Sequence, residues 1–283
     1  MKKIGIITDS TSDLTKEMYE KYDIEVFPLY VILQGKTYAD GIDITMEELY
    51  AKVDKCGELP KSSNVSPAKF TELFTQYLEK YESIVYFGIG SDLSATCQNA
   101  KLAASEFEEG KVYVGDSKNL SSGIGLLLLK AAKFREEGYS AKEIYEKVEA
   151  LVPYVRTQFA INTLKYLHMG GRCSGVSKFF GTALKLKPII RVIDGKLVVG
   201  KKPIGYKKAL SALLDYFKAD LENVDLDNVF VTHAVAKSDA EYLEEELGKM
   251  IPSECLRETC ASGVIATHCG PRTIGILYLV KPE

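Results

Sequence analysis

Small hydroxyl side chains gather in several loops of the sequence, most of them directly after a segment that is expected to be a strand. They occur at residues 8–12, 62–66, 91–96 and 116–122. In a parallel sheet such loops meet at the carboxyl edge, where folds of this kind bind ligands. The helices that begin there present unpaired N–H groups and a partial positive charge, which suits an anion. The pattern therefore favours an anion site at this edge.

Helix capping is the simpler interpretation of a serine in such a loop. Ser66, which precedes a proline, is typical of a helix N-cap, and Ser12 fits the same role. Ser62, Ser63 and Ser94 together exceed what capping requires. We therefore interpret these three as candidate ligand-binding hydroxyls.

Two further segments carry isolated reactive groups. Residues 169–175 form a loop of small residues that contains Arg172 and Cys173, and residues 267–271 place His268 in an expected tight turn before the last strand. A single histidine in a turn is more often a hydrogen-bonded turn residue than a ligand group. Both interpretations of His268 stay open at this point.

The usual signatures of nucleotide-binding and hydrolytic enzymes do not occur in the sequence. No G-x-G-x-x-G opens a helix, and the P-loop-like end at residues 35–37 has Tyr30 where the first glycine should stand. No G-x-S-x-G occurs either, and the nearest match, residues 171–175, follows no clear strand. We therefore expect no catalytic residue.

Composition argues against nucleic acid and metal as ligands. The 36 basic and 39 acidic residues are well mixed and give a net charge of -3, so no basic face for nucleic acid is expected. The six cysteines and three histidines show no C-x-x-C or H-x-x-x-H spacing. We expect free thiols, no metal site and no cofactor.

The hydropathy pattern gives no reason to expect export or membrane insertion. The first apolar run covers only residues 4–7, too short for the core of a secretory signal. The longest other run, residues 124–129, is far below the roughly 20 residues that a membrane span needs. We expect a cytoplasmic protein with no integral membrane association.

The order of expected elements predicts an α/β protein with two domains. In the first half, strands at 3–8, 25–33, 83–89 and 111–115 alternate with helices, which favours a mostly parallel sheet covered on both faces. In the second half, strands at 158–162, 189–199, 228–233 and 273–279 include a hairpin. We predict an N-terminal α/β/α domain over residues 1–155 and a C-terminal α/β domain with a mixed sheet over residues 156–283, with the ligand between them.

Six segments in this order resemble the DegV family, which includes the fatty-acid-binding subunits of bacterial fatty acid kinases. Each segment alone is weak evidence for the family, but six segments in the same order across nearly the whole chain are a specific match. The segments are Thr8-Asp9-Ser10, Leu59-Pro60-Lys61-Ser62-Ser63, Ser91-Asp92-Leu93-Ser94-Ala95-Thr96, Gly115-Asp116-Ser117, Leu164-Lys165-Tyr166-Leu167 running into Gly170-Gly171-Arg172, and His268-Cys269-Gly270-Pro271.

The resemblance implies that one fatty acid lies between two α/β domains, with its acyl chain in a tunnel and its carboxylate held by hydroxyls. The family's carboxylate-binding positions fall on Ser62 and Ser94, and its head-group histidine falls on His268. Ser63 and Thr96 stand beside these hydroxyls as secondary candidates.

The resemblance also implies a protein partner, but the sequence departs from the family at one position that is associated with that partner. The arginine that is associated with the kinase falls on Arg172, but many members also carry an arginine just before the Lys207-Lys208 pair. Here Ile204 or Gly205 occupies that place. Ser62 stands where threonine is common, and Ala95 stands where glycine is usual.

These observations lead to one main hypothesis and two alternatives. The main hypothesis is a non-enzymatic carrier that binds a long-chain, palmitate-like fatty acid, presents it to a separate fatty acid kinase and contacts the membrane surface transiently. The first alternative is an acyl hydrolase that uses Ser94 or Cys173 with His268. The second is a lipid-responsive interaction module whose partner is not a kinase.

Overall fold

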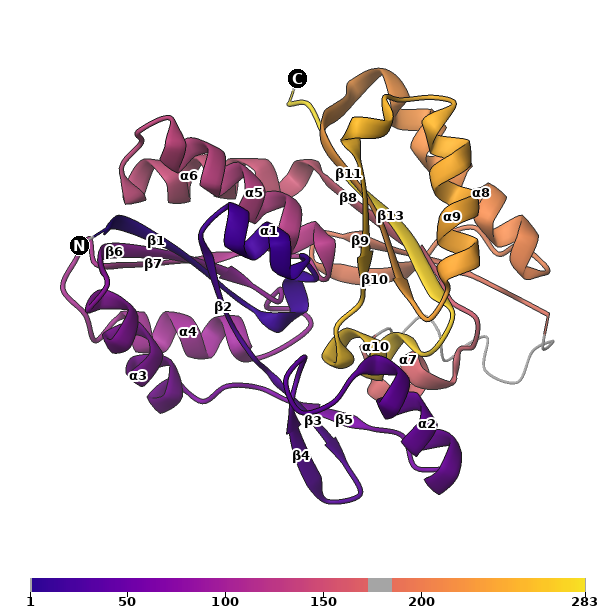
Figure 1. Cartoon of the computed structure of the whole chain (residues 1–283), viewed down its shortest axis with the longest axis horizontal. Helices are drawn as coiled ribbons and strands as arrows, with labels where there is room; N and C mark the ends of the chain where they lie inside the picture. Colours follow the sequence, from indigo (N-terminus) through magenta and orange to yellow (C-terminus); the bar gives the residue numbers. More distant parts are fainter. Residues whose placement is uncertain (1, 173–184, 283) are drawn as a thin grey trace.

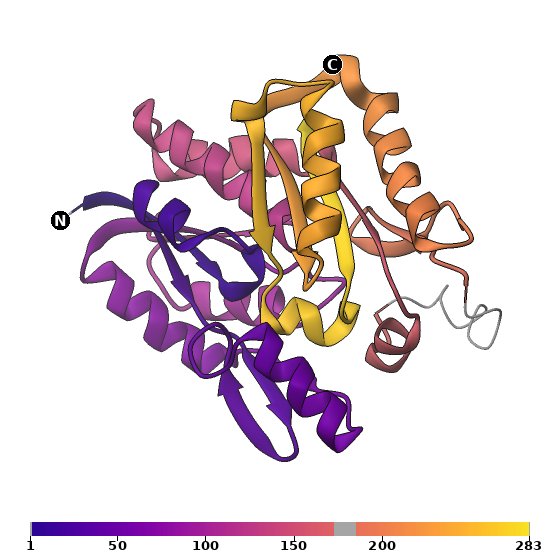
Figure 2. The ribbon, with the colours of Figure 1, turned by 45° about the vertical axis from the view of Figure 1, so that its right-hand side comes forward.

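The computed structural model describes residues 2–172 and 185–282, and its strands form three sheets surrounded by helices (Figures 1 and 2). A four-stranded sheet has the order β2-β1-β6-β7, and a six-stranded sheet has the order β10-β9-β8-β13-β11-β12. A small third sheet has the order β4-β3-β5. The predicted α/β class with a parallel and a mixed sheet is confirmed.

The four-stranded sheet is parallel at every pairing. It contains β1 (Lys2–Asp9), β2 (Ile24–Phe27), β6 (Tyr81–Gly88) and β7 (Val112–Asp116). Side chains that alternate along β1 enter different cores: Ile7 packs with α3 (Pro67–Leu78) and α4 (Thr96–Ala104), and Ile6 packs with α5 (Ser122–Glu136) and α6 (Ala141–Leu151). Helix α1 (Lys16–Lys21) contacts β2 at the sheet edge. Helices thus cover both faces, as the alternation predicts.

Helix α5 lies between the two large sheets and is apolar on all sides over most of its length. It contacts β1 and β6 of the parallel sheet and β8, β11 and β13 of the mixed sheet. A helix that is hydrophobic all round needs such complete burial. Its buried residues are Ser122, Gly123, Ile124, Gly125, Leu126, Leu127, Leu128, Leu129, Ala131 and Ala132.

The six-stranded sheet pairs antiparallel except for β11 with β12. Its strands are β8 (Val155–Ala160), β9 (Ile189–Ile193), β10 (Lys196–Val199), β11 (Val224–Ala234), β12 (Leu256–Cys260) and β13 (Thr273–Val280). Helices α8 (Tyr206–Asp220) and α9 (Lys237–Gly248) pack on the face opposite α5. The hairpin at 189–199 is as predicted, whereas β12 is an additional strand. The division between residues 155 and 156 stays a prediction.

The described part of the chain also contains four short 3-10 helices. Each lies directly before or directly after a strand of one of the two large sheets. The turns are η1 (Ser10–Ser12), η2 (Val152–Tyr154), η4 (Leu221–Asn223) and η5 (Ser253–Cys255).

The third sheet corrects the prediction of one strand over residues 25–33. Strand β2 ends before Pro28, which has no N–H to donate to a ladder, and β3 (Tyr30–Leu33) begins a separate sheet. Strand β3 pairs with β4 (Lys36–Ala39) and with β5 (Lys61–Ser63), both antiparallel. Helix α2 (Met46–Cys56) lies beside this sheet at the bottom of Figure 1. Ser62 and Ser63 therefore lie on a strand, whereas the sequence predicts a loop.

Two short helices connect the third sheet to the rest of the molecule. Helix α10 (Gly263–Cys269) contacts α7 (Lys165–Gly170), β3, β5 and α2. Its first turn is held by carboxylates from the start of the chain. Asp13 accepts a hydrogen bond from the Ser262 N–H (2.9 Å), and Asp40 accepts from the N–H groups of Gly263 (2.7 Å) and Val264 (3.3 Å).

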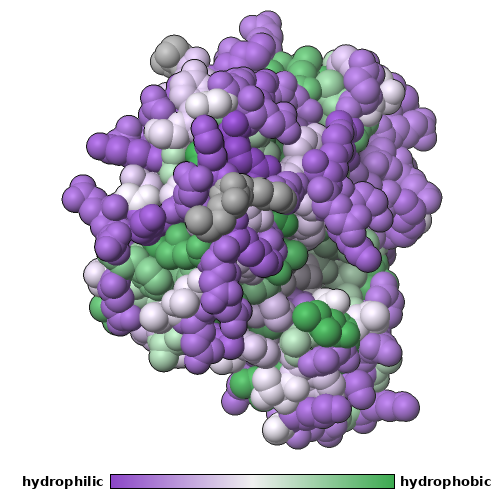
Figure 3. Space-filling view, turned by 60° about the vertical axis from the view of Figure 1, so that its left-hand side comes forward, coloured by the Kyte–Doolittle hydropathy of each residue, from purple (hydrophilic) through white to green (hydrophobic). Residues whose placement is uncertain are grey.

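Polar side chains dominate the molecular face drawn in Figure 3, where hydrophobic residues form separate small patches. Large exposed apolar side chains such as Ile42, Met169 and Ile204 are scattered over different elements. Among the described residues, no helix combines the length and the apolar character that a bilayer crossing requires.

We predict that Asp40→Ala lowers the free energy of unfolding by about 2–3 kcal/mol, because buried N–H donors of α10 lose their acceptor. Asp40 is only 3% exposed and also accepts a 2.7 Å hydrogen bond from Ser10. Asp43→Ala is the matched control, since Asp43 accepts a 2.8 Å bond from the Ala39 N–H but is exposed. Denaturant unfolding measures both variants, and equal losses would contradict the prediction.

Candidate functional site

Most of the polar residues singled out from the sequence lie around one cavity. Ser62, Ser63, Ser94, Arg172 and His268 all line it, and the cavity volume is about 50 Å³. The rest of the wall is apolar and consists of Leu29, Ile89, Leu93, Leu120, Leu167, Leu197, Val264, Ile265 and Cys269.

The closest polar contact in the cavity joins Ser62 and His268. Ser62 Oγ lies 2.8 Å from His268 Nε2, and the two residues are 206 positions apart in sequence. Strand β5 carries Ser62, and α10 carries His268 in its last turn. The contact of α10 with β5 therefore creates the pair. His268 belongs to a helix, which corrects the predicted tight turn.

His268 is neutral at physiological pH. Burial, assisted by the nearby Arg172 cation, lowers the pKa of His268 to about 4. Its Nδ1 is buried without a hydrogen-bond partner in the described structure, and a Cβ added at Gly170 would stand only 2.6 Å from it. A buried N–H donor without a partner is rarer than a buried acceptor without one. We therefore assign the ring proton to Nε2, which has a partner, and leave Nδ1 as the unprotonated nitrogen. Nε2–H then donates to Ser62 and leaves the Ser62 hydroxyl proton free.

Ser94 is held in place by the first turn of α4. The backbone N–H of Thr96 donates to Ser94 Oγ at 3.2 Å, and the two hydroxyls lie 2.9 Å apart. Thr96 itself is fully buried and does not line the cavity. Thr96 thus orients Ser94 from behind, while Ser94 faces the cavity.

Arg172 lines the cavity, is exposed, and connects the end of α7 to a loop. Its Nη1 donates to the Gly170 carbonyl at 2.6 Å, and its Nε donates to the Leu93 carbonyl at 3.4 Å. Gly171 ends α7 with a positive φ of 68°, a conformation that glycine adopts easily. Arg172 thereby joins the end of α7 to the loop that carries Ser94. Cys173, the other residue named in this loop, lies outside the described residues.

The geometry offers no complete triad for acyl hydrolysis among the described residues. His268 bonds to Ser62 and not to Ser94, whose hydroxyl bonds to Thr96. A serine–histidine pair also needs a third group that orients the imidazole, and His268 Nδ1 has none. The site therefore supplies hydrogen bonds and a neutral imidazole in an apolar cavity.

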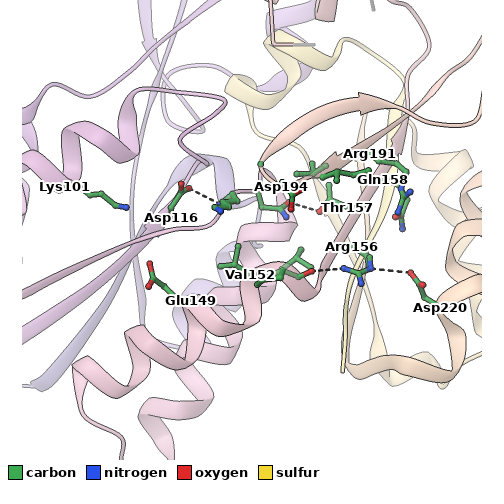
Figure 4. A pocket seen from close by; sticks show the side chains of 17 residues that line it. Lys101, Asp116, Glu149, Val152, Arg156, Thr157, Gln158, Arg191, Asp194 and Asp220 are labelled. Atoms are coloured by element: carbon green, nitrogen blue, oxygen red, sulfur yellow. Dashed lines mark hydrogen bonds and ion pairs between the residues drawn. The ribbon is translucent and has the colours of Figure 1, made fainter. Parts of the chain in front are cut away.

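A larger polar cleft lies between the two large sheets, and several of its charged side chains already bond to neighbouring protein groups (Figure 4). Arg156 lies 3.7 Å from Asp220, and Asp116 accepts hydrogen bonds from Ser91 and from the Lys118 N–H. Residues 2–172 and 185–282 contain no cluster of three His, Cys, Asp or Glu side chains suited to a metal ion. The smaller cavity is therefore the better candidate for ligand binding.

We predict that His268 stays neutral down to about pH 4 in the protein without an anion, because burial disfavours its charged form. The unfolded chain takes up this proton near pH 6.5, so this histidine lowers stability as the pH falls from about 6.5 to 4. NMR titration of the three imidazoles, assigned with His268→Gln, measures the pKa. Arg172→Ala should raise it, Arg156→Ala should not, and a midpoint at 6.5 or above would contradict the prediction.

The chain is similar to DegV proteins along its whole length. The model of the DegV family, which is described as a family of uncharacterised proteins, matches residues 3–281. A DegV domain-containing protein of Clostridium acetobutylicum is 35% identical over 99% of this chain and 100% of its own length. Protein DegV of Bacillus subtilis is 31% identical over 98% of this chain and 99% of its own.

Solved structures of similar proteins share the fold. A fatty-acid-binding DegV family protein from Thermus thermophilus has a TM-score of 0.91 at 33% identity, covering 99% of this chain and 100% of its own. DegV from Bacillus subtilis, described as a fatty acid binding protein, has a TM-score of 0.88 at 29% identity, with the same coverage. A stearic-acid-binding protein from Eubacterium ventriosum has a TM-score of 0.85 at 28% identity and covers 99% of both chains.

Proposed function

This chain belongs to the DegV family, and we propose that it binds one long-chain fatty acid. The carboxylate would lie at Ser62, Ser94 and His268, and the acyl chain would enter the apolar part of the same cavity. The observation that carries the proposal is the grouping of these three residues on one otherwise apolar cavity. Several proteins of the same fold that bind fatty acids support it.

The hydrogen bonds around Ser62 and Ser94 suit a carboxylate. With Nε2–H of His268 donating to Ser62, the Ser62 hydroxyl can donate to an anion. Ser94 Oγ already accepts a hydrogen bond from the Thr96 N–H. When the Thr96 hydroxyl also donates to Ser94 Oγ, the Ser94 hydroxyl proton is free to donate to the anion. A bound carboxylate would raise the pKa of His268 from its low value and favour the imidazolium.

The two ends of a fatty acid place opposite demands on such a site. Burial of about 14 methylenes at about 0.8 kcal/mol each gives an upper bound of about 11 kcal/mol. Desolvation of an unpaired carboxylate costs several kcal/mol, so the head group has to be hydrogen-bonded wherever the chain is buried. The composition of the cavity wall suits both ends, because its polar side chains lie together and the rest of the wall is apolar.

The remaining parts of the proposal concern what happens to the bound acid. The protein acts as a non-enzymatic carrier in lipid metabolism that needs no cofactor, works in the cytoplasm and contacts the membrane surface only transiently. It presents the carboxylate to a separate fatty acid kinase, with Arg172 at the rim as a partner contact. The exposure of Arg172 beside the cavity mouth supports this role.

We predict that organic extraction of the purified protein, followed by mass spectrometry, releases a long-chain fatty acid. The delipidated protein should then take up palmitate with the stoichiometry of one acid per chain. The same preparation should turn over none of a panel of acyl esters, since no oriented triad occurs in the described site. Failure to take up any fatty acid would overturn the proposal, and ester turnover abolished by Ser94→Ala would favour the hydrolase.

We predict that Ser62→Ala and Ser94→Ala each weaken palmitate binding about 5- to 150-fold. Each substitution removes a hydrogen bond to a buried carboxylate, which is worth about 1–3 kcal/mol. Ser105→Ala is the matched control, because Ser105 is exposed at the C-terminal end of α4 and its hydroxyl donates to the Leu102 carbonyl. Isothermal calorimetry on delipidated protein measures the affinities, and unchanged values for both site variants would show that the carboxylate lies elsewhere.

A further inference from the structure

The polar cleft between the two large sheets, drawn in Figure 4, is a second place where a ligand fits. Its volume is about 750 Å³, which lies in the range of small-molecule sites. Strand β9 pairs with β8 only over residues 158–160, whereas residues 155–157 of β8 pair with β13 alone and line the cleft. The six-stranded sheet therefore opens at this point, and the cleft lies in the opening.

Two arginines lie at one end of the cleft. Arg191 on β9 stands opposite Gln158 on β8, and Arg156 precedes Gln158 by two residues, so both arginine side chains leave the same face of the sheet. Figure 4 shows Arg156 and Arg191 on the same side of the cleft, with Lys101 and Glu149 on the other side. The two guanidinium groups can therefore meet one ligand.

Both guanidinium groups retain donors that the protein does not use. Arg191 makes no hydrogen bond or ion pair with a described residue, and its guanidinium lies over the ring of Tyr216, 4.7 Å from the centroid. Such stacking occupies the face of the guanidinium and leaves the N–H groups at its edge free. Arg156 Nη1 donates to the Pro153 carbonyl (2.9 Å), and Nε lies 3.7 Å from Asp220. Nη2 of Arg156 has no described partner.

Most carboxylates of the cleft, in contrast, already accept hydrogen bonds from the protein. Three of the four that line it have such donors, and only Asp194 at the hairpin turn has none among the described residues. The bonds join Asp116 to the N–H groups of Ser91 (3.1 Å) and Lys118 (3.0 Å), Asp220 to the Tyr278 hydroxyl (2.8 Å) and Glu149 to the Tyr145 hydroxyl. A ligand therefore meets more unpaired donors than unpaired acceptors, which favours an anion.

Asn119 adds a nearly buried donor to the same cleft. Its side chain is 3% exposed, and Oδ1 accepts hydrogen bonds from the Leu120 N–H (3.1 Å) and the Thr157 hydroxyl (2.7 Å). Because the Leu120 N–H can only donate, this bond fixes which end of the amide is oxygen. Nδ2 has no described hydrogen bond and is not fully enclosed, so it is accessible from the cleft that Asn119 lines. A donor in this position requires an acceptor from outside the protein.

We propose that the polar cleft is a second ligand site and that it binds a hydroxylated phosphate monoester, with the phosphate between Arg156 and Arg191. Paired N–H groups of a guanidinium match two phosphate oxygens, and a phosphate carries about 1.5 to 2 negative charges at pH 7, which two arginines balance. Asp194 and Glu149 repel a second anionic group but accept hydrogen bonds from hydroxyls, and Asn119 Nδ2 donates to a hydroxyl oxygen. The organic part of the ligand is therefore hydroxylated and uncharged.

The test removes one arginine of the cleft by Arg191→Gln, which breaks no described hydrogen bond. Arg257→Gln is the matched control, because Arg257 is also half-buried on the six-stranded sheet but lies on β12 and does not line the cleft. Calorimetry at low ionic strength measures the binding of glucose 6-phosphate and ribose 5-phosphate, with inorganic phosphate, glucose and citrate for comparison.

We expect the wild type to bind both sugar phosphates at least tenfold more tightly than the three comparison compounds. Arg191→Gln should weaken the sugar phosphates at least tenfold, because it removes charge-assisted hydrogen bonds to the phosphate, and Arg257→Gln should leave them unchanged. Wild-type protein that binds neither sugar phosphate or that prefers citrate, or equal losses in the two variants, would overturn the proposal.

Palmitate binding is the independent readout, since the cleft and the cavity of Ser62 and His268 share no lining residue. Arg191→Gln should bind palmitate as the wild type does. If it loses palmitate as well, the substitution disturbs the fold, and Arg156→Gln repeats the test at the other arginine with the same expected loss. Wild-type protein that binds the sugar phosphates but no palmitate would support the cleft site and overturn the proposed function.

Discussion

Helix α10 is held by hydrogen bonds from its first turn to two buried carboxylates at the start of the chain. Asp13 and Asp40 are 5% and 3% exposed, and burial raises the pKa of both, to about 8 for Asp13. Carboxyl groups in such surroundings are costly unless donors surround them. The N–H groups of Ser262, Gly263 and Val264 donate these hydrogen bonds, and they form the N-terminal, partially positive end of the helix. The position of α10 is therefore set by these hydrogen bonds as well as by apolar packing.

The candidate site depends on this helix in two ways. The same seven residues place His268 beside Ser62 and present Val264, Ile265 and Cys269 to the cavity. The α5 helix supplies the complementary constraint, since it packs against both large sheets and keeps them at a fixed separation. The Ser62–His268 pair and the spacing of the two large sheets are therefore both set by helices rather than by loops.

The sequence predicts the two large sheets and their helices well, but it does not predict helix α10, which carries His268. The alternation of strands with helices in the first half and the hairpin at 189–199 are predicted from local sequence patterns, and the structure confirms both. The sequence analysis does not predict helix α10, because a helix of seven residues is too short to show a clear periodic pattern. Ser262, which caps its N-terminus, is the one local signal for it. Ser62 also lies on a three-residue strand whose pairing partner β3 is about 30 residues away, a distance that local patterns do not encode.

The long separation between the two halves of the site has a consequence for the order in which the protein is made. The hydrogen bonds of α10 to Asp13, Asp40 and Ser62 join residues 249, 223 and 206 positions apart. A nascent chain emerges from the ribosome N-terminus first, so the parallel sheet is available long before α10. During that interval Asp13 and Asp40 have no helix to satisfy them and remain in water. The candidate site is completed only when α10 has been synthesised, and a nascent chain that lacks α10 therefore has only the Ser62 half of the Ser62–His268 pair.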